Sequence, residues 1–149
     1  EEIGFADKLM DIFKEHSINI EQITTGIDSM CVVVSSKQFH EKTIYTGVAE
    51  GLRKKIGIEE FSQYAQNKLN SDVFKIRKDK ALICVVGEGM RHTVGILSRI
   101  SGVLSKNGIN IEIIDQGPSE RNVIVGVDCS EDKDAAKKAV NFIYQEFFK

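Results

Sequence analysis

A carboxylate and a glycine that opens a helix are the residues best suited to bind a small charged molecule. Glu21 lies in the stretch INIEQITTG at residues 18–26, and Gly4 begins an apolar-striped run that predicts a helix over residues 4–16. The free N–H groups at the start of a helix attract a carboxylate, by about 0.3–1 kcal/mol and up to roughly 2 kcal/mol when partly buried. Glycine lets a ligand approach this backbone closely. With Glu21 to take an ammonium group and Asn19 to orient it, the combination describes a pocket for a free amino acid.

The same residues have simpler structural explanations. Asn19 and Asn110 suit a loop between a helix and a strand, because asparagine is frequent in turns. Glu21 and Glu112 fit outward-facing positions of a solvated strand. From the residues alone, the sequence predicts a tandem α+β module that is a candidate small-ligand binder, and both explanations stay open.

No residue pattern predicts catalysis or a bound metal. The motif GEGM at residues 87–90 lacks the remainder of a GxGxxG dinucleotide fingerprint, and no GxxxxGK[ST] phosphate loop is present. We therefore expect no cofactor in this chain. Surface positions without metal-ligand spacing are expected for the histidines, which are His16, His40 and His92.

Composition limits the class of protein and its partners. The 149 residues carry a net charge of −2, which gives no support to a nucleic-acid footprint. No signal peptide or apolar run long enough to span a membrane is visible. Three cysteines in apolar runs, without CxxC spacing, predict buried, reduced thiols in a cytoplasmic protein; they are Cys31, Cys84 and Cys129.

The chain contains an internal repeat. The stretch INIEIIDQG at residues 109–117 nearly repeats INIEQITTG, at an offset of 109 − 18 = 91 positions. Apolar positions coincide across this offset: Leu9 falls on Ile100, and Val32 falls on Val123. Two copies of one fold keep their core in this way, so the sequence predicts a tandem pair of small domains.

The first copy is expected to run helix, strand, strand, helix, strand. After the helix at 4–16, INIEQIT and MCVVVS predict strands joined by the turn GIDS. Ile44, Val48 and Leu52 mark a second helix. Residues 58–69 predict a helical piece without a counterpart in the second copy, and 73–78 alternate like a strand.

The second copy is expected to run strand, helix, strand, strand, helix. Residues 81–87 are apolar enough for the middle of a sheet, and Thr93 is a candidate N-cap for a helix whose stripe begins at Val94. INIEIID and NVIVGVD predict strands joined across QGPSER, and Asp132 is a candidate cap for the last helix.

The predicted fold is α+β: two ferredoxin-like βαββαβ domains, with antiparallel sheets and helices on one face. The first domain is expected at 1–79, with an insertion near 57–70, and the second at 80–149. Each half is one strand short of the complete unit. We expect sequence upstream of Glu1 to supply the missing strands.

Both copies resemble the ACT domains of aspartate kinases. The first is similar over GFADKLMDIFKEHSINIEQITTGIDSMCVVV, and the second more closely over the words VVGEGM, GINIEIIDQG and SERNVIVGV. The resemblance covers nearly the whole chain except about residues 57–70. It implies a C-terminal regulatory region that binds an end-product amino acid and inhibits a kinase domain, which phosphorylates aspartate with ATP and Mg and has no counterpart here.

The resemblance also implies which residues bind the effector. ACT domains of this family pair side by side and bind the effector at the interface, which implies a homodimer. A second site in other members corresponds to Gln116, Ser119 and Glu120. In lysine-sensitive relatives an aspartate replaces Glu21, and the effector-binding positions of the first copy fall on the backbone of Gly4, Phe5 and Ala6 and on Asn19, Ile20, Glu21, Thr24 and Thr25.

Two functions remain open from the sequence. The first is a regulatory region fused to its own kinase domain, sensing lysine or, second, threonine. The alternative is a free-standing ACT protein that controls a partner by contact. Binding of nucleic acid through the sheets is disfavoured by the acidic balance and by the lack of aromatic residues on the strands.

Overall fold

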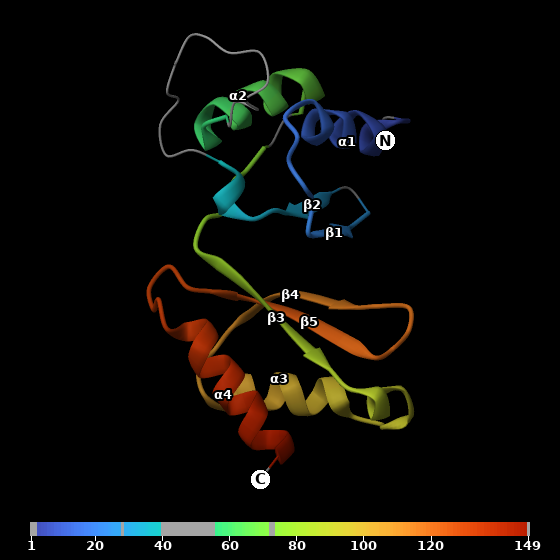
Figure 1. Cartoon of the computed structure of the whole chain (residues 1–149), viewed down its shortest axis with the longest axis vertical. Coiled ribbons are helices and arrows are strands. Elements are labelled where there is room, and N and C mark those ends of the chain that lie inside the picture. The colour runs from blue at the N-terminus through green and yellow to red at the C-terminus, as the bar shows by residue number, and fades with distance from the viewer. Residues whose placement is uncertain (1–2, 28, 40–55, 72–73, 149) are drawn as a thin grey trace. The chain divides into compact units, whose positions relative to one another are not determined.

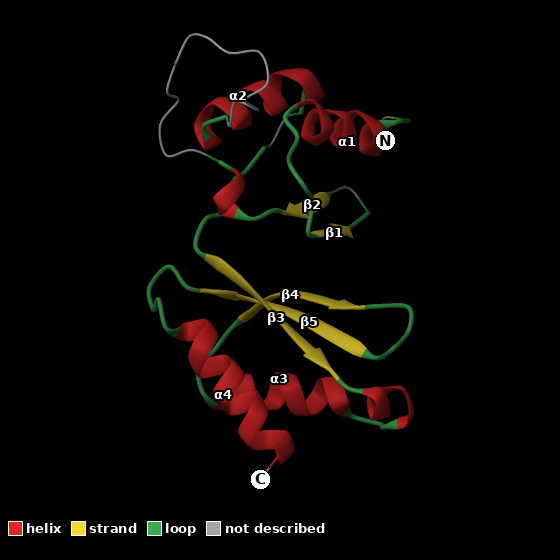
Figure 2. Ribbon diagram, in the orientation of Figure 1, coloured by secondary structure: helices red, strands yellow, loops and turns green. Residues whose placement is uncertain are grey.

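The computed structural model describes residues 3–27, 29–39, 56–71 and 74–148. The chain divides into two compact units, Glu1–Ile76 and Arg77–Lys149, and each is described by itself. Figures 1 and 2 show the helices and strands of both units.

Within the described residues, the first unit is built from two α-helices, a short 3-10 helix and a β-hairpin. Strands β1 and β2 pair antiparallel from Gln22 opposite Val33 to Thr25 opposite Met30. The N–H of Gly26 closes the hairpin by donating to the carbonyl of Ser29 over 2.8 Å. In chain order, the elements are α1 (Phe5–Glu15), β1 (Gln22–Thr25), β2 (Met30–Val33), the 3-10 helix η1 (Ser36–Gln38) and α2 (Ile58–Leu69).

Helices α1 and α2 lie on the same side of this hairpin (Figure 2). Apolar residues spaced by three and four positions form one stripe on each helix, and the two stripes meet in the core. The rings of Phe13 and Phe61 are 5.2 Å apart at their centroids. The buried core consists of Leu9, Ile12, Phe13 and Ile18 with Phe61, Ala65 and Leu69.

The second unit is a three-stranded antiparallel sheet, within the described residues, with both helices on one face (Figure 1). The strand order is β3-β5-β4, so β5 is central. The elements are β3 (Lys80–Val86), the 3-10 helix η2 (Glu88–His92), α3 (Ile96–Lys106), β4 (Ile111–Gln116), β5 (Asn122–Asp128) and α4 (Ala135–Phe148).

Alternation along β5 explains the core of the second unit. Side chains of a strand point to opposite faces in turn, and every second residue of β5 faces the helices: Val123, Val125 and Val127 are fully buried. These valines share one core cluster with the helix residues Ile100, Leu104, Ala139 and Ile143.

The predicted α+β class is confirmed, and so are most of its elements. The order α1-β1-β2-α2 repeats as α3-β4-β5-α4. The expected insertion near 57–70 needs correction, because α2 there packs into the core on α1 as α4 packs on α3. The extra length of the first unit instead lies between Val33 and Ile58.

Two strand expectations also need correction. The described residues of the predicted strand at 73–78 belong to no strand, because neither described sheet offers them a partner. Strand β3 was expected in the middle of a sheet but forms an edge, because its outer side has no neighbour among the described strands. The helix predicted around Ile44, Val48 and Leu52 lies outside the described residues.

Several side chains differ from the sequence-based expectations. Cys31 and Cys84 are exposed and only Cys129 is buried, because the first two lie on strand faces turned away from the helices. His16 is half-buried: its Nδ1 lies 2.9 Å from the carbonyl oxygen of Ile12, and its ring stacks edge-on against Phe61. His92 is exposed, as expected.

Candidate functional site

The amino end of α1 is open in the way the predicted carboxylate cradle requires. Gly4 is the N-cap and adopts a left-handed conformation, with φ 86° and ψ 9°. No side chain of the described residues caps this end. The first intrahelical bond runs from the N–H of Lys8 to the carbonyl of Gly4 over 3.1 Å. The N–H groups of Phe5 and Ala6 therefore lie before the regular helix bonds, where solvent or an anion can accept from them.

The second unit repeats this helix start. Gly95 caps α3 with φ 85° and ψ 9°, again without a side-chain cap from the described residues. Thr93 was expected as the cap, but its hydroxyl instead donates to the carbonyl of Gly89 over 2.7 Å. Val94, expected in the apolar stripe, is fully exposed because it precedes the helix.

The residues Asn19–Glu21 lie just before β1 rather than within it, and their backbone is fixed by neighbours. The side-chain amide of Gln38 accepts from the N–H of Asn19 over 2.7 Å and donates to its carbonyl over 2.8 Å. The N–H of Glu21 donates to the carbonyl of Val33 over 2.9 Å. The role of Gln38 could not be predicted from the sequence, because its partner is 19 positions away.

The carboxylate of Glu21 is exposed and makes no hydrogen bond or ion pair within the described part of the chain. Ile20 beside it is half-buried and packs against the core of the first unit. Glu21 is therefore held by its backbone while its charge is available to a ligand.

Within the first unit the two halves of the predicted site are far apart. Gly4 precedes α1 and Asn19 follows it, and an 11-residue helix is about 16 Å long. Strand β1 runs back toward the amino end of α1 (Figure 1), which brings Thr24 and Thr25 toward the end that carries Gly4. The helix start at Gly4 and the chain segment that leads to Glu21 thus begin at opposite ends of α1.

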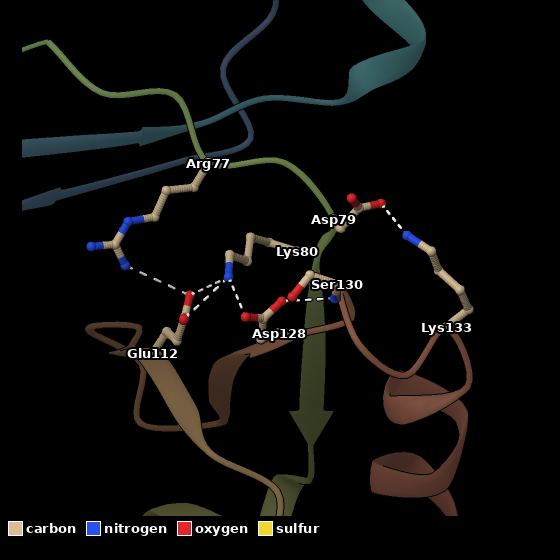
Figure 3. A network of polar contacts seen from close by, with 7 residues as sticks. All are labelled: Arg77, Asp79, Lys80, Glu112, Asp128, Ser130 and Lys133. Atoms are coloured by element: carbon tan, nitrogen blue, oxygen red, sulfur yellow. Dashed lines mark hydrogen bonds and ion pairs between the residues drawn. The ribbon is translucent and has the colours of Figure 1, made fainter.

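In the second unit the residue equivalent to Glu21 is already ion-paired (Figure 3). Glu112 stands at 21 + 91 = 112. The Nζ of Lys80 lies 3.0 Å from Oε2 of Glu112 and 2.8 Å from Oδ2 of Asp128. Arg77 approaches the same Glu112 oxygen at 3.8 Å. The acidic position of the second repeat is therefore neutralised by the protein's own cations.

The pKa values in this network follow from its geometry. The hydrogen bonds from Lys80 and from the backbone N–H of Ser130 hold the pKa of Asp128 well below its ordinary range. Hydrogen bonds to Asp128 and Glu112 raise the pKa of Lys80 above 10.5, against a smaller opposing effect of desolvation. The cluster is charged on both sides at neutral pH.

The second predicted effector site lies at the other end of the second unit's sheet. Gln116 ends β4, and Ser119 and Glu120 lie in the turn to β5, where Glu120 has φ 57° and its N–H donates to the carbonyl of Gly117. All three are exposed.

A groove of about 410 Å³ lies elsewhere in the second unit, where α3 ends and β4 begins. It is lined by Ser101, Ser105, Gly108, Ile109, Asn110 and Ile111.

Gln22 is a polar core residue that the sequence reasoning passed over. Its side chain is 7% exposed, and neither its amide nitrogen nor its amide oxygen has a hydrogen-bond partner among the described residues. Its equivalent at 22 + 91 is Ile113. The repeat comparison carried this signal, because a half-buried apolar position in the second copy, Ile113, is an amide in the first.

Other kinds of site are limited by two findings. The residues described by the structure contain no group of three or more histidine, cysteine, aspartate or glutamate side chains placed to hold a metal ion. None of the helices in the described ranges combines the length and apolar character needed to cross a membrane.

Comparison with known proteins identifies the family. Residues 83–147 match the model of the ACT domain. Aspartokinase 3 of Bacillus subtilis is 35% identical over 147 residues, which are 99% of this chain and 28% of that protein. The solved structure of the aspartate kinase of Clostridium acetobutylicum matches with a TM-score of 0.80 and 33% identity, over 99% of this chain and 30% of that one. The chain is an aspartokinase regulatory region.

More distant structures share the fold of this regulatory region. The ligand-free regulatory subunit of aspartate kinase from Thermus thermophilus has a TM-score of 0.66 at 20% identity, over 100% of this chain and 86% of that one. Aspartokinase III of E. coli, in complex with lysine and aspartate, has a TM-score of 0.64 at 19% identity, over 99% of this chain and 28% of that one. The regulatory region thus spans under a third of the length of the complete kinases that it matches.

Proposed function

We propose that the chain senses an end-product amino acid for an aspartate kinase in the cytoplasm, and that the effector is lysine, with threonine as the second candidate. The parent enzyme would convert ATP and L-aspartate to 4-phospho-L-aspartate, with ATP and Mg held by its own kinase domain. Effector binding here would inhibit that domain. The length of the aspartokinase relatives favours this arrangement over a free-standing sensor acting on a partner protein.

The observation that carries the choice of site is the difference between Glu21 and Glu112. The two residues are equivalent in the repeat, but only the Glu21 carboxylate lacks a partner within the described residues, since Glu112 is bound by Lys80. An exposed, unpaired carboxylate suits a ligand with an ammonium group. Lysine carries two such groups, and an aspartokinase of the same fold has been crystallised with lysine.

The length of α1 supports a site that is shared between the first units of two protomers. A lysine molecule is much shorter than the helix that separates Gly4 from Asn19. In the proposed site, the backbone of Gly4, Phe5 and Ala6 of one protomer binds the carboxylate of the ligand. Glu21 of the other protomer binds the ammonium group of the same ligand. A two-fold homodimer provides two such sites, because a symmetric interface presents each surface twice.

Three further sets of residues belong to the proposal. Asn19 and Ile20 flank Glu21 and complete the ammonium side of the site. Thr24 and Thr25 lie toward the helix start in the same unit and would contact the ligand's carboxylate side. An additional effector site at the turn of the second unit would use Gln116, Ser119 and Glu120.

Calorimetric titration of the chain with lysine, threonine and methionine tests the proposal. Lysine should bind most tightly, and Glu21→Ala should weaken its binding by roughly 1.5–3 kcal/mol, or about 10- to 150-fold, through loss of a charged hydrogen bond. Glu112→Ala is the matched control and should leave lysine affinity unchanged. Unchanged affinity in a folded Glu21→Ala protein would refute the site. Equal losses in both variants would assign a role to each copy.

A further inference from the structure

The second unit carries a lysine at the position where the proposed function places a bound ammonium group. Lys80 comes from β3, and its Nζ reaches across β5 to the carboxylate of Glu112 on β4 (Figure 3). The same nitrogen contacts Asp128 on β5. Carboxylates from two strands therefore surround this nitrogen. It lies 2.8 Å from Oδ2 of Asp128, 3.0 Å from Oε2 of Glu112 and 3.1 Å from Oε1 of Glu112.

This arrangement is more enclosed than the other ion pairs of the second unit. The side chains of Lys80 and Glu112 are each 21% exposed. The neighbouring pair of Lys133 and Asp79 is 71% and 50% exposed, although its atoms are only 2.6 Å apart. A half-enclosed cation held by two carboxylates resembles a bound ligand more than a solvated surface pair, which contributes little.

The first unit has no such lysine in the described residues. The carboxylate of Glu21, which is equivalent to Glu112, is exposed and without a protein cation there. The offset of 91 would place the counterpart of Lys80 before Glu1. Within the described residues, the acidic position is therefore occupied by a protein lysine in the second copy and not in the first.

We propose that Lys80 is a built-in substitute for the effector's ammonium group, which closes the acidic position of the second repeat to free amino acids. The proposal rests on the function proposed above for Glu21. It explains how a duplicated module can keep the motif INIE in both copies and bind effector ammonium at only one of the two INIE motifs. Lys80 then determines which copy senses the amino acid.

Rescue by small amines tests the substitution directly. Removing the side chain in Lys80→Ala leaves Glu112 and Asp128 facing each other without the central cation, and the melting temperature should fall. Propylammonium, which matches the three carbons and the nitrogen that the substitution removes, should restore most of that loss in a saturable manner. It should not do so in Lys80→Ala/Glu112→Gln. Lys133→Ala is the matched control, because an exposed pair offers an added amine no enclosed place.

Lysine titration adds a second measurement. Lys80→Ala should bind one more lysine per chain than the wild type, and this extra, weaker site should be absent from Lys80→Ala/Glu112→Gln. If Lys80→Ala does not fold, Lys80→Met with methylammonium replaces it, because the methionine keeps the aliphatic stem. Equal amine responses in the single and double variants overturn the proposal. This comparison decides the role of Lys80 even if wild-type lysine binding proves independent of Glu21, which would refute only the function proposed for Glu21.

Discussion

Gly4 and Gly95 adopt almost the same left-handed backbone conformation, with φ of 86° and 85°, at the starts of α1 and α3. They stand 91 positions apart, at the same offset as the repeated INIE motifs. Left-handed geometry is costly for residues with a Cβ, whereas glycine adopts it readily. In both copies, a glycine at the N-cap therefore leaves the helix start without a side-chain cap from the described residues.

Substitution of these glycines should destabilise the chain through backbone strain alone. A Cβ at Gly4 or Gly95 would meet no atom within 4 Å, so Gly4→Ala and Gly95→Ala should each cost about 1–2 kcal/mol. Gly102 lies inside α3 with equal space, and Gly102→Ala should instead stabilise by about 0.5–1 kcal/mol. Urea unfolding of the three variants measures both signs, and a neutral Gly4→Ala would argue against the strain.

Gln22 should reduce the stability of the first unit. Its buried amide is unpaired within the described residues, and an unsatisfied buried polar group costs about 1–3 kcal/mol. Gln22→Ile adopts the residue type of Ile113 in the other copy and should raise the free energy of unfolding by about 1–2 kcal/mol.

The reciprocal change, Ile113→Gln, is its control and should be destabilising, because Ile113 packs closely against Gly126 in the sheet. Urea unfolding of the full chain reports both variants. If Gln22→Ile proved less stable than the wild type, the amide would have a partner in solution.

The parts of the fold that follow a local period were predictable from the sequence. The stripe of Leu9, Ile12 and Phe13 predicts α1, and the alternation along residues 122–128 predicts β5, because each pattern reflects one buried face. The repeat of INIE predicted two units of the same element order. These features depend on neighbours a few positions away.

The missed features depend on partners distant in the chain. Gln38 clamps Asn19 from 19 positions away, and Lys80 meets Glu112 from 32 positions away. The apolar composition of β3 suggested a central strand, yet composition does not record how many neighbours the strand has among the described residues. The ion pair of Glu112 with Lys80, which separates the two copies within the described residues, could therefore be learned only from the structure.

The stability of the second unit should fall in acid through Asp128. The pKa of this carboxyl is lowered in the folded protein by Lys80 and Ser130 from an ordinary value of 3.8. A lowered folded pKa adds stability that is present above 3.8 and is lost as the pH falls toward the folded value. Asp128→Asn lacks this contribution, so the difference between the two proteins should be largest at neutral pH and should shrink progressively as the pH falls below 3.8.

Urea unfolding as a function of pH checks this convergence. Asp134→Asn is the control, because the Asp134 carboxylate makes no hydrogen bond or ion pair within the described residues. Parallel curves for the wild type and Asp128→Asn across the acid range would show that Lys80 does not lower the pKa of Asp128.

The chain should form a homodimer, because its proposed ligand site needs groups from the first units of two protomers. Gly4 precedes α1, and the segment that leads to Glu21 follows the other end of this helix, which is about 16 Å long. The hairpin β1-β2 is a two-stranded sheet within the described residues, and unpaired strand edges invite pairing with another chain.

Light scattering at tens of micromolar should therefore give twice the mass of 16.6 kDa, and lysine should strengthen the association. Glu21→Ala should abolish the lysine effect while leaving the ligand-free association unchanged, since the free carboxylate contributes to the interface only through the ligand. A monomer with and without amino acids would remove the basis for a shared site.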